Sequence, residues 1–147
     1  MEVDPRRVSV FFYGTFISPT VLAEYGIIAK DLLPARVGGF ELYIRPRVNL
    51  VPSDGANVYG AIACVTHEDL EKIYSDLEKR FGLKYLPEAV LAETLDETPA
   101  VEPVLCYIAS HMAPGPAASE YVKDLADCVR ALNFPESYGL HIKSFGL

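Results

Sequence analysis

Five short runs of apolar, β-prone residues are spread along the chain, and some of the intervals between them lack helix signals. The predicted strands cover residues 8–13, 37–44, 57–65, 89–95 and 104–110. Neighbouring parallel strands need a connection of a dozen or more residues, usually a helix. Two intervals instead carry the glycine, proline and acidic residues of loops, in VNLVPSDGAN and LDETPAVEP. This order predicts an α+β fold and not an alternating parallel sheet.

One predicted strand contains a glycine, Gly60, within the run VYGAIACV. Glycine weakens the interior of a strand, and it commonly marks a bulge or a place where another backbone comes close. The sequence predicts one of these two features at Gly60 and does not distinguish between them.

Three helices are predicted from their capping residues. Ser18, followed by a proline, is expected to cap a short first helix. Thr66 and Asp69 form a variant of the capping box, with Asp in place of Glu or Gln, and Gly82 is expected to end this second helix. Ser119 is expected to cap a third helix, which ends before a Phe-Pro pair.

Charge and composition argue against several classes of function. The 147 residues, half of them apolar and 22% charged, predict one soluble domain over residues 1–147. The formal net charge of −7 disfavours nucleic acid and anionic membranes as partners. No apolar run approaches the ~20 residues that span a bilayer. Three widely spaced cysteines and no secretory signal predict a cytoplasmic protein without disulfides, and the three scattered histidines give no metal-ligand spacing.

The second helix carries an acidic residue beside its apolar face. At about 100° per residue, five residues form one apolar stripe: Leu70, Ile73, Tyr74, Leu77 and Phe81. Glu78 lies roughly 80° from the centre of this stripe, and Glu71 lies slightly further out on the same side. A carboxylate half sheltered by apolar neighbours is a better base near neutral pH. The alternative is that Glu78 is an ordinary solvated residue on the helix flank.

The first predicted strand runs directly into a glycine, in the stretch VFFYGTF. A strand that ends on glycine commonly makes only a tight turn. In the functional interpretation, the backbone N–H groups of Gly14, Thr15 and Phe16 form a concave nest that holds a carboxylate or an oxyanion. Neither of the glycine-rich fingerprints of nucleotide-binding proteins is present, which argues against a polyphosphate ligand.

Several stretches, in this order, resemble those of the γ-glutamyl cyclotransferase-like superfamily. VFFYGTF is similar to the family's glycine loop, and NLVPSDGANVYGAIACV to its segment that ends in Val-x-Gly and a strand. THEDLEKIYSDLE is similar to the stretch in which Leu-Asp-x-x-Glu carries the catalytic glutamate, a register that places Glu78 at that position. Tyr85 matches a tyrosine shortly after it, and SEYVKDLADCVRALNFPESYGL resembles the terminal helix followed by Leu-Pro-x-x-Tyr. Four residues differ from the pattern: Tyr74 and Ser75 replace Leu-Asp, Phe16 replaces a leucine after the loop, and Pro87 replaces an arginine often seen two residues after the tyrosine.

The resemblance implies a small mixed β-barrel with flanking helices. It also implies a reaction without cofactor or metal, in which the α-amine of a γ-glutamyl substrate attacks its own γ-carbonyl and releases 5-oxoproline and a free amine. In that reaction Glu78 would be the general acid and base. The residues implied to bind the substrate are Tyr13, Gly14, Thr15, Phe16 and Tyr85.

The partner implied by this resemblance is a small γ-glutamyl molecule, with the chain a monomer or a homodimer. The alternative is a non-catalytic domain on the same barrel, which binds a small carboxylate or serves as an interaction module. The two interpretations differ in whether a sheltered carboxylate faces the ligand.

Overall fold

The strands form a closed barrel. In the computed structural model, which describes residues 7–28, 32–44, 47–110, 112 and 115–145, the strands are β1 (Arg7–Phe12), β2 (Leu33–Ile44), β3 (Val48–Thr66), β4 (Leu86–Thr94) and β5 (Val101–Ile108). Their order around the barrel is β1-β3-β2-β4-β5. The β1–β5 pair is parallel and the other pairs are antiparallel, so the barrel is mixed, as expected.

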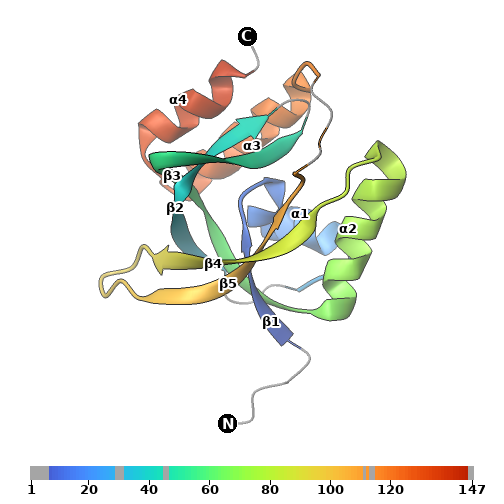
Figure 1. Ribbon diagram of the computed structural model, residues 1–147, viewed down its shortest axis with the longest axis horizontal. Helices are drawn as coiled ribbons and strands as arrows, with labels where there is room; N and C mark the ends of the chain where they lie inside the picture. The colour runs from blue at the N-terminus through green and yellow to red at the C-terminus, as the bar shows by residue number, and fades with distance from the viewer. Residues whose placement is uncertain (1–6, 29–31, 45–46, 111, 113–114, 146–147) are drawn as a thin grey trace.

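The helices flank this barrel on different sides (Figure 1). They are α1 (Pro19–Glu24), α2 (His67–Phe81), α3 (Ser119–Ala131) and α4 (Glu136–Ser144), and a 3-10 turn, η1 (Thr15–Ile17), precedes α1. Helix α2 runs along one flank, whereas α3 and α4 pack on each other towards the end where the C-terminus lies. The predicted α+β fold with a mixed barrel and flanking helices is confirmed.

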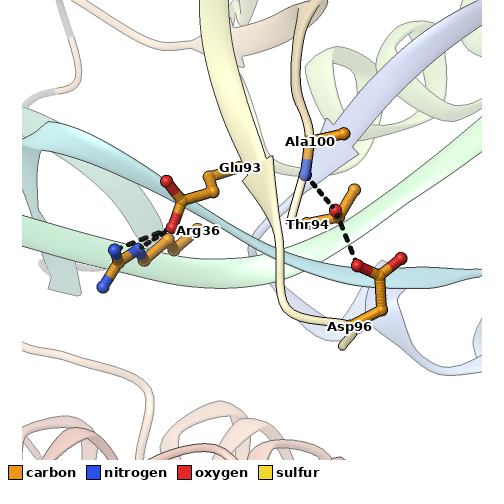
Figure 2. A network of polar contacts seen from close by, with 5 residues as sticks. All are labelled: Arg36, Glu93, Thr94, Asp96 and Ala100. Atoms are coloured by element: carbon orange, nitrogen blue, oxygen red, sulfur yellow. Dashed lines mark hydrogen bonds and ion pairs between the residues drawn. The ribbon is translucent and has the colours of Figure 1, made fainter. Parts of the chain in front are cut away.

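The barrel closes through a short seam between β2 and β4. In the described part of the chain, only Ala35–Thr94 and Arg36–Glu93 pair across it. Arg36 donates two hydrogen bonds to one oxygen of Glu93, from Nε at 3.1 Å and from Nη2 at 2.7 Å (Figure 2). The buried Thr94 holds the turn after β4, because its hydroxyl accepts a hydrogen bond from the Ala100 N–H at 2.9 Å. Since the Arg36–Glu93 pair is half-exposed, it contributes more to register than to stability.

Residues 48–57 correct the sequence-based interpretation, because they belong to strand β3 and not to a loop. The first residues of this segment are buried and pair with β2. The Ser-Asp-Gly signal has a local effect only. After the pair Phe40–Pro52 the next pair is Gly38–Asn57, so β3 bulges away from β2 between them. Bulges and chain reversals both favour residue types such as Ser, Asp and Gly. The composition of this segment therefore did not distinguish a bulged strand from a loop.

Gly60 lies where two strands approach closely, which is one of the two features expected there. A Cβ atom at this position would lie 2.1 Å from the Phe12 carbonyl oxygen and 2.9 Å from Cζ of Phe11. The other feature, a bulge at Gly60, is wrong, since Gly60 pairs with Ala35 in a regular register. Only a residue without a side chain allows β1 to lie against β3 at this distance.

The predicted helix caps are confirmed at α1 and α2. Ser18 occupies the N-cap position of α1, although its side chain makes no capping hydrogen bond. At α2 the Thr66 side chain accepts a hydrogen bond from the Asp69 N–H at 3.1 Å, and the Asp69 carboxylate accepts one from the Thr66 N–H at 3.3 Å. Gly82 ends α2 with a φ of 68°. The N-cap residue of α3 is Ala118, one position before the expected one. The sequence does not predict α4, which is short, begins after a proline and contains a glycine.

Asn49 is a buried polar residue that ties β3 to the chain after β5. Its Nδ2 donates to the Ala109 carbonyl at 2.7 Å, and its Oδ1 accepts from the Ala109 N–H at 3.0 Å. Asn49→Ala should lower the free energy of unfolding by about 2–4 kcal/mol, because two buried backbone groups lose their partners. Urea denaturation measures this change. The exposed Asn57→Ala is the control, expected to change it by less than about 0.5 kcal/mol. Equal losses in the two variants would contradict this role of Asn49.

Three further expectations concern membranes, thiols and metal ions. None of the described helices has the length and apolar character needed to cross a membrane. All three cysteines are free. The described residues contain no group of His, Cys, Asp and Glu side chains arranged to hold a metal ion.

Candidate functional site

A cavity of about 480 Å³ opens between the loop after β1 and helix α2. This volume lies within the range of roughly 300–1,000 Å³ that is usual for small-molecule sites. All five residues that the resemblance implies as substrate-binding line it: Tyr13, Gly14, Thr15, Phe16 and Tyr85. The fold therefore brings these residues together, although Tyr85 is about 70 positions away from the loop in the sequence.

The glycine of the loop is required by a close contact with helix α3. A Cβ atom on Gly14 would lie 2.6 Å from the Tyr121 hydroxyl and 2.9 Å from Cγ1 of Val48. The same hydroxyl accepts a hydrogen bond from the Thr15 N–H at 3.4 Å. The expected nest needs free N–H groups on Gly14, Thr15 and Phe16. The Thr15 N–H is not free, because it already donates to the Tyr121 side chain. Gly14 lets Tyr121 reach the loop, and the hydroxyl proton of Tyr121 remains to be donated.

Tyrosines dominate the cavity lining. Six of the nine tyrosines of the chain line it: Tyr13, Tyr25, Tyr74, Tyr85, Tyr107 and Tyr121. Three of their hydroxyls donate to protein groups, namely Tyr13 to the Tyr107 carbonyl at 2.6 Å, Tyr85 to the Val48 carbonyl at 2.5 Å and Tyr25 to the Asp76 carboxylate at 2.6 Å. Burial raises the pKa of Tyr13 and Tyr74 well above the usual value, and it raises the pKa of Tyr121 to about 12. These phenols therefore stay protonated at neutral pH.

The same arrangement of barrel and helices occurs in solved structures. An uncharacterized protein from Homo sapiens superposes with a TM-score of 0.77 and 16% sequence identity, over 95% of this chain and 88% of that chain. A gamma-glutamyl cyclotransferase superposes with a TM-score of 0.74 and 15% identity, over 94% and 87% of the two chains. A yeast gamma-glutamyl cyclotransferase specific to glutathione superposes with a TM-score of 0.63 and 13% sequence identity, over 96% of each chain. No family model and no curated protein matches the sequence.

This chain has the γ-glutamyl cyclotransferase-like fold. Identities of 13–16% establish the shared fold and leave the activity to be argued from the site itself. On this γ-glutamyl cyclotransferase-like barrel, the chemistry available to a ligand depends on which side chains of α2 line the cavity.

Glu78 does not line the cavity. Its side chain is exposed, whereas the residues of α2 that line the cavity are Tyr74, Leu77, Arg80 and Phe81. Positions 78 and 80 lie about 200° apart around a helix. The cavity therefore covers part of the apolar stripe and the border marked by Arg80, and Glu78 lies on the opposite border, outside the lining. The prediction that apolar neighbours shelter Glu78 is wrong, because periodicity placed it beside the stripe without indicating which border faces the cavity.

A second register of the γ-glutamyl cyclotransferase-like motif fits the geometry of α2. The leucine and glutamate of Leu-Asp-x-x-Glu are four positions apart, and hence on one helix face. When the motif is shifted by three residues, it starts at the buried Leu77, has Glu78 in the aspartate position and has Phe81 in the glutamate position. The differences at Tyr74 and Ser75 then disappear. In this register an aromatic ring, and not a carboxylate, faces the cavity at the end of α2.

Arg47 is a cavity residue that the sequence did not indicate. Its guanidinium carbon lies 3.9 Å from the centre of the Phe81 ring and 4.7 Å from the centre of the Tyr121 ring. Such contacts between a cation and aromatic faces hold a guanidinium in place. Arg47 follows β2, Phe81 ends α2 and Tyr121 lies in α3, so no short sequence pattern contains all three. Only the tertiary structure brings them together.

The carboxylates of the cavity lie at its rim. Glu24, Glu120 and Asp124 line it, and all three are exposed. Water stabilises the charged form of an exposed carboxylate, which makes such a group a weak base. These rim residues can contact a charged ligand group at the mouth, but none of them is desolvated in the way that general base catalysis requires.

Proposed function

We propose that the cavity binds a small molecule through its carboxylate group and does not cyclise it with a base on helix α2. The observation that carries this proposal is the composition of the face of α2 that lines the cavity. Tyr74, Leu77 and Phe81 lie there, while Glu78 is exposed outside it. This is the non-catalytic interpretation of the barrel, supported by the position of one side chain.

Cyclisation of a γ-glutamyl group has a specific chemical requirement. The α-ammonium must lose a proton before its nitrogen attacks the γ-carbonyl, and the amide nitrogen that leaves must gain one. An α-ammonium has a pKa near 8, so an ordinary carboxylate is a poor acceptor unless its surroundings favour its protonated form. Among the described lining residues, the carboxylates are the exposed ones at the rim. The described lining thus supports ligand binding, because it offers an arginine and aromatic walls, but it provides no sheltered base.

The second candidate function is γ-glutamyl cyclotransferase activity. It is favoured by the solved structures that share this fold, among which are gamma-glutamyl cyclotransferases by name. It is also favoured by the loop with Gly14, which lines the cavity as the resemblance implies. In this case Glu24, Glu120 or Asp124 would have to accept the proton from the ammonium at the mouth of the cavity.

One experiment separates the two candidates. Purified protein is incubated with γ-glutamyl dipeptides, γ-glutamylamines and glutathione, and 5-oxoproline is measured. Binding of the same compounds is followed by the shift of the thermal midpoint. We expect protection by at least one carboxylate ligand and no 5-oxoproline above the uncatalysed rate. Release of 5-oxoproline would establish the cyclotransferase, and neither release nor protection would contradict both candidates.

Glu78→Gln tests the corrected position of this residue. Because the side chain is exposed and outside the cavity, the variant should bind ligands within about twofold of wild type and unfold within about 0.5 kcal/mol of it. Calorimetric titration and urea denaturation measure the two quantities. A loss of binding by an order of magnitude would return Glu78 to the site.

A further inference from the structure

Among the residues that the structure describes, the half-buried cation of Arg47 has no counter-ion. In the part of the chain that the structure describes, no carboxylate lies within 4.0 Å of its guanidinium nitrogens, whereas Arg36, Arg80 and Arg130 each pair with one. Taking a cation partly out of water is costly unless an anion compensates it. The contacts that Arg47 does make are with aromatic rings, and they leave its charge open to a ligand in the cavity.

The geometry of this contact favours a carboxylate. Arg47 lies over the faces of the Phe81 and Tyr121 rings, so the edge of its planar guanidinium carries the N–H groups that are left to donate. Two parallel N–H groups on one edge match the two oxygens of a carboxylate. The Tyr121 hydroxyl, which accepts from Thr15 and keeps its own proton, is a second donor on the same side of the cavity.

The cavity walls beyond the Arg47 guanidinium and the Tyr121 hydroxyl are aromatic. Nine of the twenty lining residues are Phe or Tyr. Because the hydroxyls of Tyr13, Tyr25 and Tyr85 already bind protein groups, these residues offer mainly ring surface to a ligand. Tyr74 and Tyr107 stack with their ring centres 4.0 Å apart and their planes within 8°, which gives one wall an ordered aromatic surface. Such a lining favours a planar apolar body over a flexible polar one.

The charges at the mouth limit the ligand to one negative charge. Three carboxylates, Glu24, Glu120 and Asp124, line the cavity together with two arginines, and one of these arginines, Arg80, is already paired with Asp76. A second negative charge on the ligand would face these carboxylates, and the described lining residues offer no further unpaired cation to balance it. A phosphate or a dicarboxylate is therefore disfavoured against a monocarboxylate.

We propose that the cavity binds an aromatic monocarboxylic acid, with the carboxylate on Arg47 and the ring against the tyrosine wall. This rests on the proposed function, in which the cavity takes a small carboxylate, and it names the class of that ligand and the residue that recognises it. Phe81 contributes to the same binding site, because its ring contacts the Arg47 guanidinium. Position 81 is the one that the shifted motif assigns to a glutamate.

The test uses three probes and three variants of the full chain. The probes are 3-phenylpropionate, its neutral amide 3-phenylpropanamide, and glutarate, each titrated by calorimetry and by tyrosine fluorescence, which no tryptophan obscures. Wild type should bind the acid at least about tenfold more tightly than the amide or glutarate. Arg47→Met should weaken the acid about 10- to 100-fold and leave the amide unchanged, which also shows that the variant is folded. Arg47→Lys should bind the acid with an affinity between those of wild type and Arg47→Met, since lysine keeps the charge but makes no bidentate contact.

Arg130→Met is the matched control. It removes the same charge from an exposed site on α3 outside this cavity, and binding of the acid should stay within about twofold of wild type. Equal binding of acid and amide by wild type, or tight binding of the acid by Arg47→Met, overturns the role of Arg47. Tighter binding of glutarate than of the aromatic acid overturns the aromatic class and leaves the proposed function standing. Binding of none of these acids and of no γ-glutamyl compound overturns both.

Discussion

Gly60→Ala should destabilise the protein by at least about 3 kcal/mol or prevent it from folding, because the added Cβ atom has no space. It would lie 2.1 Å from the Phe12 carbonyl oxygen, which belongs to the backbone of β1 and cannot rotate away as a side chain can. The Phe11 ring lies 2.9 Å away on the same side. Relief requires β1 and β3 to separate, and these strands pair over six residues of the barrel. With a typical total stability of roughly 5–15 kcal/mol, such a loss is severe.

Guanidinium denaturation measures this effect, with Gly139→Ala as its counterpart. A Cβ atom on Gly139 meets nothing within 4 Å, and the residue lies within helix α4. Alanine is the better helix former by up to about 1 kcal/mol, so this variant should be as stable as wild type or slightly more stable. A denaturation midpoint for Gly60→Ala equal to that of wild type would mean that β1 and β3 lie further apart than described.

Phe81→Glu is expected to weaken binding of a carboxylate ligand by about 10- to 100-fold. The Phe81 ring lies 3.9 Å from the guanidinium carbon of Arg47, so a carboxylate at this position would reach the cation and compete with the ligand for it. It would also repel a second carboxylate in the same corner of the cavity. Calorimetric titration with 3-phenylpropionate measures the loss.

Phe81→Leu separates charge from the loss of the ring. Leucine removes the contact between the cation and the ring, worth about 0.5–1 kcal/mol, and adds no charge. We therefore expect a reduction of about fivefold or less for this variant. If Phe81→Glu and Phe81→Leu weaken binding equally, the ring alone matters and the charge of Arg47 does not. The two variants thus test the shared role of positions 47 and 81 independently of any enzymatic assay.

The sequence anticipated most of the fold for local reasons. The capping box at Thr66 and the glycine after α2 are satisfied by neighbouring residues, and they are observed as expected. The strands were predicted from runs of apolar, β-prone residues, and this signal lies within each run itself. The segment 48–57 is the exception, because its pairing with β2 overrides the turn residues that it contains. The resemblance of ordered motifs supplied the barrel, and the strand pairing of the chain confirms it.

The candidate site was predicted in part. The loop from Tyr13 to Phe16 and the distant Tyr85 line one cavity, as expected. Glu78 does not, because helical periodicity defines an apolar stripe but treats its two borders alike. Three residues of the stripe itself, Tyr74, Leu77 and Phe81, line the cavity, together with Arg80 at the border opposite Glu78.

By itself, the sequence determined most of the strands, the helices α1, α2 and α3, and the capping residues of α2. These features depend on backbone conformation and on the apolar periodicity of each segment. Only the tertiary structure decided which face of α2 lines the cavity and that Arg47 lies over Phe81 and Tyr121. Those contacts join residues from three separate elements, and their distances are set by how the barrel closes and the helices pack against it.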